Sequence, residues 1–388
     1  MLLLNLLILA LAAYIYPQLR SAFSTDTAMS QTALLLHEAG TPLVVGHRPI
    51  PQPGENQLLV KVLVAGLNPH DQRTRDNGLF VSSYPYVLGA DLVGEVLKVG
   101  TGERSARFSI GEHVFGHTMA EGGDPNDFNA AQQYALVDAR FVGRIANSGL
   151  SVDEAATIPV NVLAAFIALF AKAGHGFPPP FSSEAKSFEF VSVTLLVIGG
   201  GSNTGRAVVE LAALAGIGRI IVVAGMRQAD SLRSRGATHI IDRYAANVLE
   251  QIRAVAGDDL VYAIDTVNAG ENQELGVAAL SNTRKGMLIT LRRPEGEFDA
   301  ARIGSKSAGY ERRLVFGVSP IHPEVTVGFW EEIPRWLREK KVHPSSFEVI
   351  EGLDAEAANK VLDAYRDGSG MKTNIHPWGD EKDPHVHL

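Results

Sequence analysis

At residues 195–205 the chain reads LLVIGGGSNTG, and at residues 206–216 it continues RAVVELAALAG. An apolar run too short for a helix meets a glycine cluster, and apolar residues then recur at helical spacing. This pattern predicts a strand, a tight turn and a helix. Such a turn leaves the first backbone N–H groups of the helix pointing outward, where the helix dipole favours negative charge, so a pyrophosphate fits there.

The dinucleotide-binding fingerprint G-x-G-x-x-G is incomplete in this turn. Gly200, Ser202 and Gly205 hold its three places, so the middle glycine is missing. An apolar run at 219–223 follows and completes a strand–helix–strand unit. A glycine turn without a ligand remains the alternative. The predicted phosphate-binding residues are Gly200, Gly201, Ser202, Asn203, Thr204 and Gly205.

The end of the second strand bears on the type of cofactor. NAD-binding proteins usually carry Asp or Glu there, but this chain has Ala224-Gly225-Met226-Arg227. With no carboxylate to repel a 2′-phosphate and with an arginine nearby, we predict NADPH rather than NADH. The alternative is that Arg227 is an ordinary surface arginine.

The composition limits the classes of function. The 388 residues allow two domains, and 46% hydrophobic and 20% charged residues are typical of a globular protein. A formal net charge of −8 argues against nucleic acid as a partner. The chain has no cysteine, so disulfides and thiolate metal sites are excluded. Its histidines lack metal-site spacing, and we predict no metal.

Residues 1–16 are almost wholly apolar and precede Pro17. They are shorter than the roughly 20 residues that span a bilayer. Two interpretations stay open: membrane association through residues 1–16, or a true start at Met29. We treat 1–28 as outside the fold and expect a cytoplasmic protein, or a membrane-associated one if the segment is real.

Three further blocks are more specific than the glycine turn. They read GLNPHD at 66–71, YPYVLGADLVGEV at 84–96 and IGEHVFG at 110–116. Their order and spacing resemble the medium-chain dehydrogenase/reductase superfamily, in its zinc-free branch of quinone oxidoreductases and trans-acting enoyl reductases. The resemblance extends from about Leu34 to about Val318.

The resemblance implies a doubly wound Rossmann parallel sheet inserted in a GroES-like, partly closed β-barrel domain, an α/β fold. We expect the GroES-like catalytic domain at 29–160 and 342–378, the Rossmann cofactor domain at 161–341, and a disordered tail at 379–388. Expected strands include 260–268, 286–291 and 313–318. A helix is expected from Val325 to Lys341, with Phe329, Ile333, Trp336 and Leu337 on its buried side.

Departures from the family are informative. Zinc members hold their catalytic metal with a cysteine, a His-Glu pair and a third ligand. The matching positions here are Asn68, Ala90-Asp91 and Asn161. Zinc-assisted chemistry is therefore not expected. Ala164 also stands near a place where relatives often have a threonine that lines the nicotinamide.

The expected site residues follow from the blocks and the sheet. Asn68 and Asn161 are candidates for polar contacts to cofactor or substrate, and His70 and Tyr86 are candidate proton donors. For each, a loop residue holding its own backbone is the alternative. Further expected cofactor contacts are Asp71, Tyr244, Val267 and Asn268, the last two because their strand should end near the nicotinamide.

These features predict an NADPH-dependent, metal-independent oxidoreductase that reduces an activated C=C bond or a quinone. Its partner would be a small-molecule substrate, and monomer and homodimer both remain open. The alternative is a dinucleotide-binding redox-sensing or pathway-partner module without turnover. Oxidation of NADPH by an acceptor would separate the two.

Overall fold

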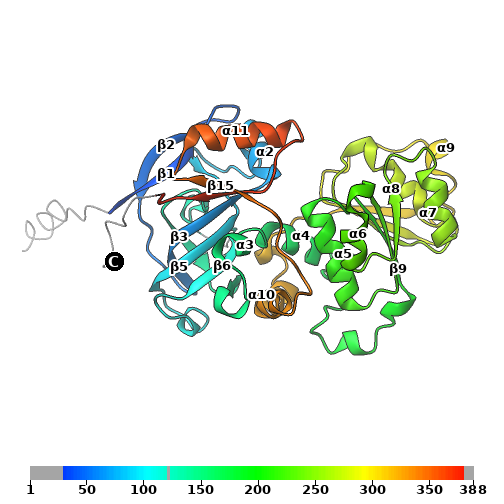
Figure 1. Ribbon diagram of the computed structural model, residues 1–388, viewed down its shortest axis with the longest axis horizontal. Coiled ribbons are helices and arrows are strands. Elements are labelled where there is room, and N and C mark those ends of the chain that lie inside the picture. The colour runs from blue at the N-terminus through cyan, green and yellow to red at the C-terminus, as the bar shows by residue number, and fades with distance from the viewer. Residues whose placement is uncertain (1–28, 120–122, 380–388) are drawn as a thin grey trace, which may run out of the picture.

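The computed structural model describes residues 29–119 and 123–379, which form two lobes joined by buried helices (Figure 1). The predictions for residues 1–28 and for the tail from 380 lie outside the described residues. Within them, one helical stretch, Val152–Phe170, is long and apolar enough to cross a membrane, but 67% of its apolar window is buried inside the protein. The core helix of a globular protein has the same properties.

The cofactor lobe is built on a six-stranded parallel sheet. Its order is β11-β10-β9-β12-β13-β14, so the first strand in sequence lies in the middle and the chain winds outward in both directions. This is the doubly wound order, and it confirms the predicted fold class. The strands are β9 (Thr194–Ile198), β10 (Arg219–Ala224), β11 (His239–Asp242), β12 (Tyr262–Asp265), β13 (Gly286–Thr290) and β14 (Tyr310–Leu314).

Helices cover the two faces of this sheet (Figure 1). Because the parallel strands are buried on both faces, β9 and β10 read as continuous apolar runs. The helices of this lobe are α5 (Asn203–Ala215), α6 (Ala229–Ser234), α7 (Val248–Ala256), α8 (Glu274–Ala279) and α9 (Ala300–Ile303).

Two predicted strands are corrected. The last strand is Tyr310–Leu314 rather than 313–318. The misleading apolar run leaves the sheet and packs elsewhere, since a Cβ added at Gly317 would lie 2.9 Å from the Cβ of Ala164. The strand expected at 260–268 ends at Asp265, because the Asp265 carboxylate turns the chain by accepting hydrogen bonds from the N–H groups of Val267 and Asn268.

The other lobe is a twisted, partly closed β structure. Seven strands form one sheet, in the order β15-β16-β3-β5-β6-β8 with β7 on β3, and three form a second sheet, β2-β1-β4. The strands of the large sheet are β3 (Gln57–Leu67), β5 (Asp91–Val99), β6 (His113–His117), β7 (Tyr134–Asp138), β8 (Val142–Arg144), β15 (Glu348–Glu351) and β16 (Thr373–His376). The small sheet contains β1 (Ser30–Leu36), β2 (Val44–Pro49) and β4 (Tyr86–Val87).

The end of the chain returns to this first lobe. β16 runs antiparallel to β3, and α11 (Ala355–Arg366) packs on α2 (Pro69–Asn77), as Figure 1 shows. The register places Thr373 opposite Leu67. Residues near 372 are thereby brought beside the block at 66–71, about 300 positions earlier in the chain.

Two helices lie between the lobes. α4 (Pro159–Phe170) follows the short α3 (Val152–Ala155) and packs on α5, while α10 (Pro323–Arg338) packs on both α4 and β8. The four apolar residues predicted for the buried face of α10 are all buried. Because α4 and α10 belong to one hydrophobic cluster with strands of both lobes, the exact limits 29–160, 161–341 and 342–378 stay a prediction.

Candidate cofactor cleft and active site

The glycine turn has the geometry of a phosphate-binding turn. Gly199 adopts a φ of +78°, which favours glycine, and a Cβ at Gly205 would lie 2.2 Å from the carbonyl oxygen of Gly199. Ser202 is the N-cap of α5, and its Oγ accepts a hydrogen bond of 2.9 Å from the Gly205 N–H. Ser202 at the place of the middle glycine thus has a capping role.

The side chains of this turn already have partners inside the protein. The Ser202 Oγ lies 3.0 Å from the Oγ1 of Thr266, which itself contacts the carbonyl oxygens of Ile198 and Gly199. The Thr204 Oγ1 donates to the Asn161 Oδ1 at 3.0 Å. The hydroxyls therefore fix the turn, and the backbone N–H groups at the start of α5 are the groups suited to a phosphate.

The segment after β10 meets the turn from the side. A Cβ at Gly201 would lie 2.6 Å from the Oε1 of Gln228, and this buried oxygen has no hydrogen-bond partner in the described part of the chain. The Gln228 side chain thus lies close to Gly201 and holds a buried acceptor without a donor. A bound dinucleotide, which carries hydroxyl donors, would fit both features. Its neighbour Arg227 is exposed, and Tyr244 is 74% exposed beside Arg243.

The carboxyl end of β12 lies against the same turn. The two methyl groups of Val267 would be 2.6 and 2.7 Å from a Cβ at Gly199, and Val267 is 38% exposed. The Asn268 Nδ2 donates to the Asp265 Oδ2 at 3.0 Å. Burial raises the pKa of the Asp265 carboxyl, and the hydrogen bonds from Asn268 and Val267 oppose that shift. Asp265 fixes the backbone that presents Val267 to the cleft.

Asn68 is the N-cap of helix α2, and the side chain of Asp71 caps the start of this helix. The Asp71 Oδ2 accepts from the Asn68 N–H at 2.7 Å, and the Asp71 Oδ1 accepts from the Gly89 N–H at 3.1 Å. Asp71 is 2% exposed. Its carboxylate therefore points into the protein and ties α2 to the YPYVLGAD block, rather than reaching outward.

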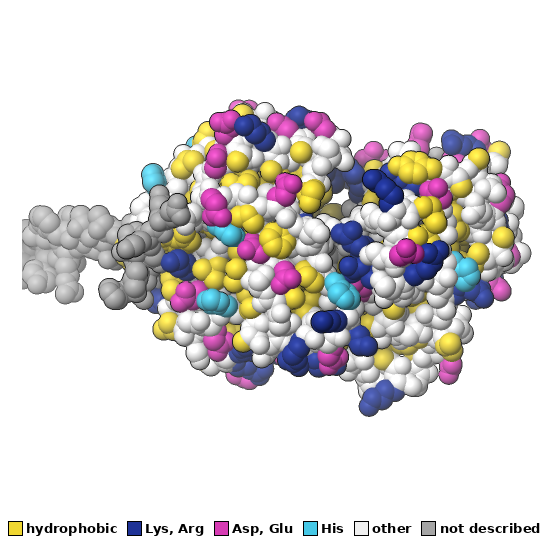
Figure 2. Space-filling view, viewed as in Figure 1, with side chains coloured by type: hydrophobic (Ala, Val, Ile, Leu, Met, Phe, Trp, Pro, Cys, Tyr) yellow, Lys and Arg dark blue, Asp and Glu magenta, His cyan; other side chains and the backbone are white. Residues whose placement is uncertain are grey.

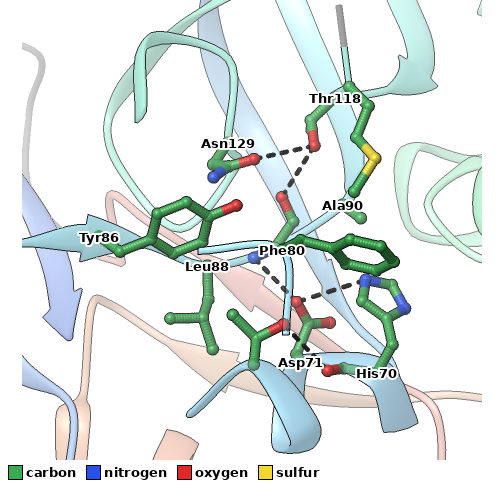
Figure 3. A pocket seen from close by; sticks show the side chains of 11 residues that line it. His70, Asp71, Phe80, Tyr86, Leu88, Ala90, Thr118 and Asn129 are labelled. Atoms are coloured by element: carbon green, nitrogen blue, oxygen red, sulfur yellow. Dashed lines mark hydrogen bonds and ion pairs between the residues drawn. The ribbon is translucent and has the colours of Figure 1, made fainter. Parts of the chain in front are cut away.

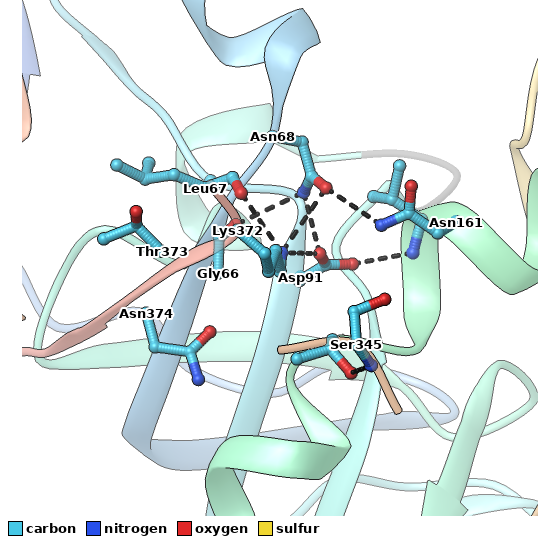
Figure 4. Close-up of polar contacts among 12 residues, drawn as sticks. Gly66, Leu67, Asn68, Asp91, Asn161, Ser345, Lys372, Thr373 and Asn374 are labelled. Carbon is cyan, nitrogen blue, oxygen red and sulfur yellow. Dashed lines mark hydrogen bonds and ion pairs between the residues drawn. The ribbon is translucent and has the colours of Figure 1, made fainter. Parts of the chain in front are cut away.

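A buried lysine lies at the centre of the polar contacts in Figure 4. The Lys372 Nζ forms an ion pair with the Asp91 Oδ2 and lies 3.2 Å from the Leu67 carbonyl oxygen and 3.4 Å from the Asn68 Oδ1. The Asn68 Nδ2 donates to the same Asp91 oxygen at 2.7 Å. Lys372 and Asp91 are almost completely buried.

This chain of contacts joins the two lobes. The Asn161 Nδ2 donates to the Asn68 Oδ1 at 3.3 Å, and the Asn161 Oδ1 accepts from Thr204. The other Asp91 oxygen accepts from the Val160 N–H at 2.6 Å, at the start of α4. A continuous polar connection thus runs from Lys372 through Asn68 and Asn161 to the glycine turn.

The same group of side chains is a poor fit for a zinc ion. Two of the three positions equated with zinc ligands, Asn68 and Asn161, carry amides, and the carboxylate of Asp91 is paired with an ammonium. A dication at this place would be repelled by Lys372. Among residues 29–119 and 123–379, no group of three His, Asp or Glu side chains is arranged to hold a metal.

A pocket opens next to this network on the catalytic lobe (Figure 3). Eleven residues line it: His70, Asp71, Thr74, Phe80, Tyr86, Leu88, Gly89, Ala90, Thr118, Met119 and Asn129. The Thr118 Oγ1 donates to the Asn129 Oδ1 at 3.2 Å. The two candidate proton donors, His70 and Tyr86, therefore face one cavity.

The titratable groups of the pocket differ in their surroundings. The His70 Nε2 lies 3.7 Å from the Asp71 Oδ1, and the His70 ring meets Phe80 edge-on at 6.5 Å. Burial raises the pKa of the Tyr86 phenol. Burial also lowers the pKa of the nearby His117 to about 4, so that imidazole is neutral at physiological pH. Tyr86 thus stays protonated and able to donate a hydrogen bond.

Several residues of the site were missed by sequence reasoning. Lys372 was overlooked because a lone lysine before a short strand carries no sequence signal. Gln228 directly follows Arg227, which was predicted to bind the cofactor. Thr266 directly follows β12, a strand that was expected to run to Asn268. The position of Thr266 at the carboxyl end of β12 is a signal that could have identified it.

Comparison with known proteins identifies similar sequences. Residues 54–164 match the family model of the alcohol dehydrogenase GroES-like domain. The dehydrogenase orsE of Emericella nidulans is 27% identical over 343 residues, which cover 85% of this chain and 94% of that protein. The trans-enoyl reductase tndF of Aspergillus flavipes is 33% identical over 228 residues, covering 58% of this chain and 63% of the relative.

Solved structures share the fold. An alcohol dehydrogenase superfamily protein from Novosphingobium aromaticivorans superimposes with a TM-score of 0.70 at 23% identity, covering 89% of this chain and 99% of that structure. The mycobacterial protein Rv1454c, solved as a complex with NADPH, has a TM-score of 0.64 at 20% identity, covering 89% of this chain and all of that one.

Proposed function

This chain belongs to the medium-chain dehydrogenase/reductase superfamily, and we propose that it is an NADPH-dependent, metal-independent reductase of an activated C=C bond or a quinone. The single observation that carries the proposal is the polar connection from the glycine turn through Asn161 to Asn68. It sets the cofactor turn beside the start of α2, where His70 faces the pocket. The relative named a trans-enoyl reductase supports the choice of C=C chemistry.

The chemistry divides between cofactor and protein. NADPH supplies the hydride, and one proton from the protein or water completes the addition across the C=C bond. The chain positions the acceptor in the pocket and offers donors to the carbonyl oxygen, on which negative charge develops. Tyr86 suits this task because burial raises the pKa of its phenol, and His70 lies in the same pocket.

Asn68 and Asn161 have a positioning role in this proposal. Asn68 is 1% exposed, and its amide N–H groups point to Asp91 and Gly66. Asn161 is partly exposed and bonds to both Asn68 and Thr204. We infer that the two amides hold α2 and the glycine turn in register, so that the acceptor meets the cofactor at the right distance.

The preference for NADPH rests on the end of β10. No carboxylate follows the strand, and the exposed Arg227 has no acidic partner among the described residues. A free guanidinium at this place suits a 2′-phosphate. Metal independence rests on the Lys372 ammonium, which already neutralises Asp91 among the positions equated with zinc ligands.

Absorbance of the reduced cofactor tests the proposal. We expect NADPH to be oxidised when an enone, an enoyl thioester or a quinone is added, with a clearly lower KM for NADPH than for NADH. Turnover should survive exhaustive chelation. Loss of activity that zinc restores would contradict metal independence, and equal KM values would remove Arg227 from its role.

The alternative, a dinucleotide-binding module without turnover, is favoured by one observation. Ala164 has no hydroxyl for the nicotinamide, and Gly317 packs directly on it. NADPH binding without oxidation by any of the three acceptors would support the module and contradict the reductase.

A further inference from the structure

Basic side chains gather along the boundary between the two lobes (Figure 2), although the protein as a whole has a net charge of −8. Arg73 lies on α2, three residues after His70 and therefore on the same side of that helix. Arg292 and Arg293 follow the carboxyl end of β13 in the cofactor lobe. Opposite lobes thus supply the members of one basic cluster.

Arg73 lies near enough to the other two arginines to feel their charges. Burial lowers the pKa of the Arg73 guanidinium, and the positive charges of Arg292 and Arg293 lower it further, while Glu295 opposes them. The lobes also touch here, since the rings of Phe80 and Phe316 meet edge-on at 6.0 Å. Phe80 also lines the pocket beside His70, so this contact between the lobes adjoins the pocket.

None of these three guanidinium groups has a carboxylate within ion-pair distance in the described part of the chain. Most other arginines there do have one; Arg75, for example, binds Asp76 and Asp363. The Arg292 Nη1 donates a long hydrogen bond of 3.5 Å to the Val267 carbonyl oxygen, and the backbone of Arg292 and Arg293 is also held. The Gln273 Nε2 donates to the Arg292 carbonyl oxygen at 3.0 Å, and the Gly270 N–H donates to that of Arg293 at 3.3 Å. Like-charged guanidinium groups that have no carboxylate in ion-pair contact are suited to binding an anion.

The cofactor's 2′-phosphate is not the anion that this cluster fits. The proposed 2′-phosphate contact, Arg227, follows β10, whereas Arg292 follows β13. These strands lie three positions apart in the sheet, about 14 Å at the usual strand spacing. β13 is on the side of β12, whose end presents Val267 to the cleft.

We propose that Arg73, Arg292 and Arg293 bind an oxyanion carried by the acceptor substrate, a carboxylate or a phosphate held outside the pocket while the reacting bond lies inside it. This inference rests on the proposed reductase function and names the class of acceptor. An anion would bridge the two lobes, because it would contact α2 on one side and the β13 loop on the other.

The test compares acceptors that share the reacting carbons and differ in charge. Crotonyl-coenzyme A carries phosphates, 4-oxo-2-pentenoate carries a carboxylate, and the N-acetylcysteamine thioester of crotonate and 3-penten-2-one are their neutral counterparts. In the Arg292→Gln/Arg293→Gln variant we expect the KM of a charged acceptor to rise at least tenfold. The KM values of the neutral acceptors and of NADPH should change less than twofold. Arg73→Gln should show the same selectivity.

Arg219→Gln is the matched control. Arg219 is an exposed arginine at the amino end of β10, the sheet edge away from the cleft, and it has no carboxylate partner among the described residues. Its substitution should change neither the KM of the charged acceptors nor that of the neutral ones. The charged acceptor that responds more strongly identifies the anion as phosphate or carboxylate. Equal changes for charged and neutral acceptors, or no change for either charged acceptor, would overturn the proposal.

Failure of the reductase function remains distinguishable. If no acceptor is turned over, calorimetric titration of each charged acceptor into the protein with NADP⁺ still reports binding. Loss of that binding in the Arg292→Gln/Arg293→Gln variant, but not in Arg219→Gln, supports the anion site without turnover. No binding of either charged acceptor to the unaltered protein would overturn it.

Discussion

Lys372 holds an ammonium group in a place that water does not reach. Its three acceptors are the Asp91 carboxylate, the Leu67 carbonyl and the Asn68 amide oxygen. A buried ion pair contributes little net stability compared with apolar residues, but removing one partner leaves an uncompensated charge. Removing either partner of this pair should therefore change the stability of the protein measurably.

We predict that Lys372→Met lowers the free energy of unfolding by about 3–5 kcal/mol, because Asp91 then remains buried and unpaired. Urea titration measures the change. Lys372→Met combined with Asp91→Asn should recover part of the loss, since the lone charge is gone. Lys360→Met, which breaks an exposed pair with Glu356, is the control and should leave the midpoint unchanged. A loss no larger than that of the control would contradict the prediction.

His175 is a second titratable residue of interest; it is half-buried and lies outside the cleft. Its Nδ1 has no partner in the described residues, and its ring packs against Tyr262 and Phe177. Burial lowers the pKa of the imidazole to about 3. The folded protein therefore keeps His175 neutral, whereas the unfolded chain takes up a proton below about pH 6.5.

This depressed pKa contributes stability that is present above pH 6.5 and is lost as the pH falls toward 3. Between pH 7 and pH 5 the loss from His175 is about 2 kcal/mol. We predict that His175→Phe reduces the pH dependence of unfolding by this amount, measured as the difference between urea titrations at the two pH values. His47→Gln, at an exposed histidine, should not. An unchanged pH dependence in His175→Phe would contradict the assignment.

At the scale of elements, the glycine turn joins β9 to α5 and leaves no space for a side chain at its last glycine. A Cβ at Gly205 would lie 2.2 Å from the Gly199 carbonyl oxygen and 2.7 Å from the Gly200 Cα. Helix and strand must separate to admit it, and the N–H groups at the start of α5 would move with the helix.

We predict that Gly205→Ala weakens NADPH binding at least tenfold and lowers the melting temperature, because the turn cannot keep its shape. Fluorescence titration and circular dichroism measure the two effects. Gly225→Ala is the control for stability, since its φ is −71° and a Cβ there meets nothing within 4 Å. Unchanged NADPH affinity in Gly205→Ala would exclude this turn as the phosphate site.

The observed helices and strands also show which parts of the fold could be predicted from the sequence. The pattern from 195 to 223 predicted β9, the turn, α5 and β10, because local periodicity and the glycines determine these elements. It failed at 313–318, where an apolar run packs on Ala164 instead of extending β14. The role of Lys372 in the site could not be predicted from local patterns. Its contact with Asp91 spans 281 residues and depends on how β16 pairs with β3.

At the scale of the whole molecule, the two lobes share one core. A single hydrophobic cluster contains Val64, Val93 and Phe115 of the catalytic lobe together with Leu195 and Val197 of the cofactor lobe. α4 and α10 connect them: Phe329 of α10 packs on Phe166 of α4, and Trp330 meets Phe115 edge-on at 6.0 Å. Loss of packing in one lobe therefore removes support from the other.

We predict that the lobes unfold in one cooperative transition although the chain is long enough for two domains. Trp330 and Trp336 report on the junction and Trp378 on the first lobe, where it packs on Tyr134. Trp378→Phe and the double variant Trp330→Phe/Trp336→Phe separate these signals in a urea titration followed by fluorescence.

Phe329→Ala, which opens a cavity at the junction, should lower the free energy of unfolding by about 3–5 kcal/mol. Introduced into each tryptophan variant, it should shift both signals by the same amount, because the cavity lies in a core that both lobes share. Phe188→Ala, at a partly exposed ring of the cofactor lobe, is the control and should shift both only slightly. Two separate transitions, with only the junction signal moved by Phe329→Ala, would show that the lobes are stable independently and that the shared cluster does not couple them.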